Sequence, residues 1–167
     1  MNFKKTLCIV LAAAAVVCSF ASCDSGSDNN NGGGDTAQTQ AAAVDVAAVA
    51  EQLKSGITFE DSLVEFDSGK IEKVLGIVPG AYSNAKVYES STGATPEEIA
   101  CFEATSSDMA DTIKNALNAR LTAQQNTFND YKPEQAPKLS DAVLIVKDNC
   151  VFFCVSGDSA KAKQIIG

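Results

Sequence analysis

The spacing of apolar residues predicts two amphipathic helices in the globular part of the chain. In 107–128 the apolar residues recur at intervals of three and four, which places them on one face of a long helix. The segment 44–53 shows the same spacing, and Gly56 follows it as a typical helix terminator. We therefore expect a long central helix and a shorter helix near the start of the domain.

Two further helices are indicated by their capping residues. Ser68 is a candidate N-cap for a short helix over 68–75, which Gly76 would end. Asp158 can cap a final helix over 159–166.

Alternating and β-branched residues predict an antiparallel sheet. We expect strands over 85–90, 98–104, 142–147 and 150–155, and a short edge strand over 63–66. Thr95 followed by Pro96 also fits a helix start, but the alternation after them favours a strand. The predicted fold class is α+β, an antiparallel sheet of about four strands in two hairpins, with the long helix and the terminal helices packed on it.

The last two strands are predicted to form a tight hairpin. Only 148–149, an Asp-Asn pair that tolerates positive φ, separates them. With a two-residue loop, Val146 faces Val151 and Val143 faces Cys154.

The first residues have the pattern of a secretory signal. Lys4 and Lys5 precede an apolar run of roughly fifteen residues, shorter than the ~20 that span a bilayer. Residues 20–23, Phe-Ala-Ser-Cys, resemble the lipobox of bacterial lipoproteins, which implies cleavage after residue 22 and a lipid on Cys23. The alternatives are ordinary secretion without a lipid, with cleavage after residue 21 or residue 22, or acylation of Cys18, which lacks a small residue before it.

A polar tract separates this leader from the globular part. Residues 24–40 contain no large apolar side chain, so they cannot bury enough surface to offset their ordering entropy. The expected organisation is a signal peptide over 1–22, a lipid-anchored tether over 23–43 and one globular domain over 44–167.

Charge and composition exclude several classes of function. Loss of Lys4 and Lys5 with the leader lowers the 13 basic residues to 11 against 21 acidic ones, a net charge near −10 that disfavours nucleic acid. The sequence has no histidine, which excludes Ser-His-Asp and Cys-His catalysis. We expect no cofactor and no metal site.

Three cysteines would remain in the mature domain: Cys101, Cys150 and Cys154. The last two are four residues apart in one strand, so their α-carbons lie roughly 13 Å apart, too far for a disulfide. Core packing is the favoured interpretation, and a disulfide between Cys101 and one of the others is the alternative.

Arg120 is the main candidate site residue. It lies at the edge of the apolar stripe, where it can pair with Glu98 or with carbonyls of 131–137. Such a pair would clamp helix to sheet, and a ligand carboxylate or phosphate would also suit the guanidinium. Tyr131 is the second candidate ligand contact. The acids at 60, 61, 97 and 98 are interpreted as solvated surface.

Several motifs carry a family resemblance. They are SSTGATPEEIACF at 90–102, Arg120 with Gln124, YKPEQ at 131–135, and Val-Phe-Phe at 151–153. Together they resemble a family of small uncharacterised domains found in lipoproteins of Gram-positive anaerobes, over about 45–166. The resemblance implies an α+β fold and a location in the cell envelope, and it implies no activity.

We therefore expect a lipoprotein held at the outer face of the cell membrane through Cys23, with a non-catalytic domain that binds an envelope protein or a small ligand. The oligomeric state is open. The alternatives are a small histidine-free enzyme that uses Arg120 and Tyr131, and a structural component of the envelope.

Overall fold

The computed structural model describes residues 44–167. The predicted signal peptide, the lipid-attachment residue Cys23 and the tether lie outside the described residues. Within the part described, no helix combines the length and apolarity that crossing a bilayer requires.

The described residues form an α+β domain, as the sequence predicts. In chain order its elements are α1 (Val46–Gly56), β1 (Leu63–Glu65), α2 (Ser68–Leu75), β2 (Tyr82–Ser90), β3 (Glu98–Ala104), α3 (Ser107–Tyr131), α4 (Ala136–Ser140), β4 (Val143–Lys147), β5 (Cys150–Val155) and α5 (Ser159–Ile166). Short 3₁₀ turns cover Pro79–Ala81 and Pro133–Gln135. The sheet order is β1-β2-β3-β5-β4, and every neighbouring pair is antiparallel.

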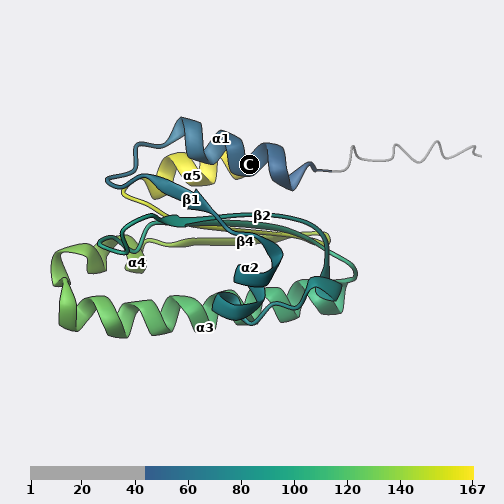
Figure 1. Cartoon of the computed structure of the whole chain (residues 1–167). Helices are drawn as coiled ribbons and strands as arrows, with labels where there is room; N and C mark the ends of the chain where they lie inside the picture. Colours follow the sequence, from purple (N-terminus) through teal and green to yellow (C-terminus); the bar gives the residue numbers. More distant parts are fainter. Residues whose placement is uncertain (1–43) are drawn as a thin grey trace, which may run out of the picture. The chain divides into compact units, whose positions relative to one another are not determined.

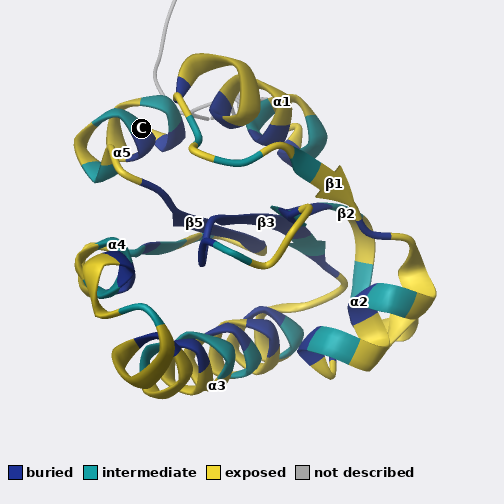
Figure 2. Ribbon diagram, turned by 60° about the vertical axis from the view of Figure 1, so that its left-hand side comes forward, coloured by how far each residue is buried: buried dark blue, intermediate teal, exposed yellow. Residues whose placement is uncertain are grey.

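Helices cover both faces of this sheet (Figure 1). α1 and α5 lie on one face, and α3 and α4 lie on the other (Figure 2). Each face has its own apolar cluster. Ala100 and Phe102 of β3 join the cluster under α3, whereas Ile99 and Cys101 join the one under α1 and α5. This alternation follows from the two-residue period of a strand, and it buries β3 on both sides.

The predicted hairpin is confirmed in its register. Val146 pairs with Val151, and Val143 pairs with Cys154. Asp148 adopts a positive φ of 51° in the turn, the conformation that Asp tolerates better than most residues.

Several details differ from the sequence prediction. The sheet has five strands rather than about four, because the edge strand expected over 63–66 forms as Leu63–Glu65 and pairs with the C-terminal end of β2. The N-cap of α2 is Asp67 rather than Ser68, since the Asp67 carboxylate accepts from the Lys70 N–H. α3 continues to Tyr131, and the short α4 was not predicted.

Candidate functional site

Arg120 of α3 joins the helix to two glutamates of the sheet. Its Nε donates to Glu98 Oε2 at 3.1 Å, and its Nη2 donates to Glu89 Oε1 at 2.7 Å. The two glutamates are register partners on β2 and β3. Like charges in directly opposite positions repel, and the guanidinium between them offsets that repulsion. Of the two partners that the sequence offered for Arg120, the structure selects Glu98.

Gln124 lies one helical turn after Arg120 and contacts the same carboxyl group. Its Nε2 donates to Glu98 Oε2 at 3.1 Å. Glu98 is 0% exposed and Gln124 is 8% exposed. Burial raises the pKa of Glu98, and Arg120 opposes that rise. The Oε1 atoms of Glu98 and Gln124 are both buried, and neither has a hydrogen-bond partner among residues 44–167.

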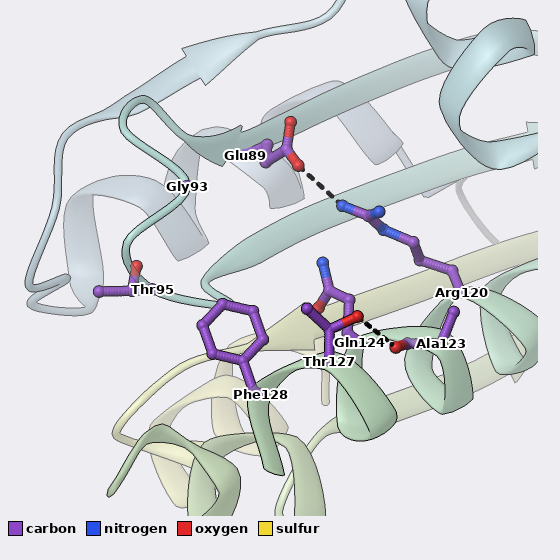
Figure 3. Close-up of a pocket in the computed structure, with 8 residues that line it drawn as sticks. All are labelled: Glu89, Gly93, Thr95, Arg120, Ala123, Gln124, Thr127 and Phe128. Atoms are coloured by element: carbon purple, nitrogen blue, oxygen red, sulfur yellow. Dashed lines mark hydrogen bonds and ion pairs between the residues drawn. The ribbon is translucent and has the colours of Figure 1, made fainter. Parts of the chain in front are cut away.

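A small hollow opens beside this cluster, between α3 and the loop that joins β2 to β3 (Figure 3). It has a volume of about 200 Å³. Its walls are formed by Glu89, Gly93, Thr95, Arg120, Ala123, Gln124, Thr127 and Phe128. The hollow therefore combines a guanidinium, a carboxylate, an amide and one aromatic ring.

Tyr131, the other predicted candidate, does not line this hollow. Its side chain is 66% exposed, at the last position of α3. The structure thus brings Arg120 and Glu98 together and leaves Tyr131 apart. Its neighbour Lys132 does reach the loop, where its Nζ donates to the Ala94 carbonyl at 3.2 Å.

The interpretation of the acids as solvated surface was wrong for Glu97 and Glu98. Glu97 is 1% exposed. Its carboxylate accepts from Lys138 Nζ at 2.8 Å, from the Thr95 hydroxyl at 3.1 Å, and from the N–H groups of residues 60 and 61. Lys138 also contacts Glu60 at 2.8 Å. A buried charge needs such partners, and all of these except Thr95 come from distant parts of the chain.

Asp61 organises the loop after β2. Its carboxylate accepts from the Ser90 hydroxyl at 2.6 Å, from the Thr92 N–H at 3.0 Å and from the Thr92 hydroxyl. These hydrogen bonds hold the pKa of Asp61 well below its usual range. The loop that borders the hollow is therefore fixed from one side by Asp61 and from the other by Lys132.

Three of the four motifs that carry the family resemblance have residues at this end of the domain. Thr95, Glu98, Arg120 and Gln124 border the hollow or contact its walls. Gln135 of the 131–135 motif donates to Glu60 at 3.0 Å. Sequence reasoning did not assign Gln124 a role, although its position four residues after Arg120 places both on one face of α3.

The three cysteines of the described domain are free and buried. They belong to the apolar cluster under α1 and α5, on the face opposite Arg120. Burial raises the pKa of Cys101, and it raises the pKa of Cys154 to about 12. Core packing is confirmed, and the alternative disulfide from Cys101 is not formed.

The fold and the partly buried Glu-Arg-Glu cluster define a small α+β domain with a polar hollow at one end. The chain belongs to a family whose model, described as a domain of unknown function (DUF4358), matches residues 56–156. No curated protein matches the chain, and no solved structure matches it.

Proposed function

We propose that this protein is a lipoprotein held at the outer face of the cell membrane through Cys23, and that its domain is a non-catalytic binding module. The hollow beside Arg120 is the proposed ligand site. The observation that supports it is the guanidinium of Arg120, which lines the hollow and uses only Nε and Nη2 in its hydrogen bonds to the described residues.

The hollow suits a small polar molecule, or one polar end of a larger one. Its volume of about 200 Å³ is below the range of roughly 300–1,000 Å³ that is common for ligand pockets. The hydrogen bonds that Arg120 makes within the domain use Nε and Nη2, so Nη1 can donate to a ligand. A carboxylate or phosphate oxygen is the natural acceptor for it, and Phe128 supplies an apolar wall.

The geometry of the acidic groups supports binding rather than catalysis. Glu89 and Glu98 are both held by the same guanidinium, so neither is a free general base beside the hollow. The enzyme alternative also relied on Tyr131, which lies away from the hollow.

Anchorage is tested by metabolic labelling with a fatty-acid analogue in cells that express the full chain. We expect Cys23→Ala to abolish labelling and to move the protein from the membrane fraction to the medium. Cys18→Ala is the matched control, and it should leave labelling unchanged. Labelling that persists in Cys23→Ala would refute acylation at this residue.

Binding at the hollow is tested by ligand-observed NMR on the full-length protein. The probes are acetate, inorganic phosphate, glycerol and methylammonium. We expect at least one of the two anions to bind, and Ala123→Phe, which fills the hollow from an exposed position, to abolish that signal. Ala119→Phe, on the same helix but outside the hollow, should retain it. Absence of any signal that Ala123→Phe removes would overturn the proposed site.

A further inference from the structure

The carboxyl group of Glu98 and the side-chain amide of Gln124 are in contact, and each has one oxygen without a hydrogen-bond partner among the described residues. Glu98 Oε2 accepts two hydrogen bonds, from Arg120 Nε and from Gln124 Nε2, both at 3.1 Å. The second oxygen of the carboxyl group and the oxygen of the amide are both buried and both lack a partner among residues 44–167. If Glu98 were ionised, these two atoms would both be acceptors, and neither could satisfy the other.

One proton would satisfy both atoms. Because Oε2 is already engaged by two donors, the proton would belong on Oε1. A protonated carboxyl group can donate from one oxygen and accept at the other, and a primary amide has the complementary pair of atoms. The contact between Gln124 Nε2 and Glu98 Oε2 is one half of such a two-bond pair, and a bond from Glu98 Oε1–H to Gln124 Oε1 would be the other half.

We propose that Glu98 holds a proton at neutral pH and that this proton joins it to Gln124 as a closed acid–amide pair. The pair ties the middle of α3 to the first residue of β3. Protonation of Glu98 was not predicted from the sequence.

The charges around Glu98 are compatible with a neutral carboxyl group. Glu98 contacts Arg120 of α3, and the Nη2 atom of the same guanidinium contacts Glu89 of β2. Glu89 also lies 3.7 Å from Lys70 of α2. The register partner of Glu98 on β5 is the apolar Val155. Arg120 therefore retains a full counter-charge in Glu89 when Glu98 is neutral, and burial favours the neutral form.

Loss of the proton has a specific consequence for the hollow. An ionised Glu98 would place a charge in a site with no contact to water and would leave Gln124 Oε1 beside a carboxylate oxygen. Rotation of the Gln124 side chain away from Glu98 would separate the two oxygens. Because Gln124 forms part of the wall of the hollow, this rotation would change the hollow as well. At alkaline pH we therefore expect α3 to loosen at Gln124 first.

Infrared difference spectroscopy on the full-length protein tests the proposal. A protonated carboxyl group has a C=O stretching band that is separate from those of carboxylates and amides. We expect the wild-type protein to show this band at pH 7 and Glu98→Gln to lose it completely. Glu103→Gln, on the same strand, is the matched control and should retain it.

A second variant tests the pairing itself. In Gln124→Met the proton of Glu98 loses its acceptor, so the band should move towards the frequency of a carboxyl group without a hydrogen bond. The proposal is overturned if the wild type lacks the band at pH 7, or if Glu98→Gln leaves it in place. A band that Gln124→Met does not shift would overturn the acid–amide pair. Absence of the band from the wild type is decisive even if a variant does not fold.

Discussion

Glu89 and Glu98 stand directly opposite each other on adjacent strands, and a single arginine from α3 is bonded to both. The guanidinium supplies a counter-charge to Glu89 and a hydrogen bond to Glu98, so the packing of α3 helps to hold these ends of β2 and β3 together. It also places the Arg120 guanidinium next to the hollow, with its positive charge balanced by Glu89 of the sheet.

The first prediction concerns this cation. Arg120→Met should lower the free energy of unfolding by about 1–3 kcal/mol, because it removes one of the two hydrogen bonds to the buried Glu98 Oε2 and the ion pair with Glu89. Urea denaturation followed by circular dichroism measures the change. Lys114→Met, at an exposed position of the same helix, should stay within about 0.5 kcal/mol of wild type. Equal effects of the two substitutions would show that Arg120 is not a clamp.

The second prediction concerns the pH dependence of stability. The pKa of Glu98 in the folded state lies above its ordinary value of 4.5, so the folded protein binds this proton more tightly than the unfolded chain does. Its contribution to stability is therefore fully present below pH 4.5 and is lost as the pH rises through the folded-state pKa.

Glu98→Gln removes this dependence, because its amide can make both bonds to Gln124 without a proton. The stability of wild type relative to this variant should be greatest in acid and should decrease as the pH rises. Denaturation curves for the two proteins over a range of pH measure the difference. A difference that is constant with pH would contradict the raised pKa.

The third prediction concerns the other buried acid. Lys138→Met should destabilise the protein by about 1.5–3 kcal/mol, the range for hydrogen bonds to charged groups, since Glu97 keeps its bonds to Thr95 and to the backbone of residues 60 and 61. Combining it with Glu97→Gln should give a loss smaller than the sum of the two single losses. Strict additivity in this cycle would mean that the pair contributes no coupling.

The fourth prediction concerns the loop beside the hollow. Asp61→Asn should speed amide hydrogen exchange at Thr92, whose N–H is bonded to the Asp61 carboxylate. Because the pKa of Asp61 is lowered from its ordinary value of 3.8, the stabilisation by its charge is fully present above pH 3.8 and is lost progressively as the pH falls from there through the folded-state value. Exchange at residues of α5, far from this loop, serves as the internal control.

The fifth prediction concerns the thiols. Iodoacetamide at neutral pH should leave Cys101 and Cys154 of the native protein unmodified, because only the thiolate reacts and burial raises both pKa values. Both should react fully in denaturant. Mass spectrometry of peptides from the two samples gives the comparison, and rapid modification of the native protein would indicate that this face opens.

Local patterns were sufficient to predict most of the fold. The hairpin of β4 and β5 follows from two alternating strands and a two-residue turn, and its register is confirmed. The short α4 was not predicted, because Pro133 and Pro137 interrupt any helical pattern there. The apolar stripe of α3 ends at Phe128, three residues before the helix itself ends at Tyr131.

The site was predictable only in part. The pairing of Arg120 with Glu98 was one of two alternatives, because an arginine at the edge of an apolar stripe needs a partner on the sheet. The burial of Glu97 could not be inferred, since its partners come from residues 60–61 and from Lys138, which no local pattern relates to it. Consecutive acids usually lie in solvent, and only tertiary contacts reveal an exception.

The sheet order gives the last strand of the chain an interior place. β5 lies between β3 and β4, so a nascent polypeptide that ends before Cys150 would have a gap in its sheet and β4 without a neighbour. Assembly must therefore wait for the C-terminal segment to emerge. For a polypeptide that is exported in an extended form, such a delay would be an advantage, because the chain stays unfolded, and so able to pass through a translocation channel, until its translation is nearly finished.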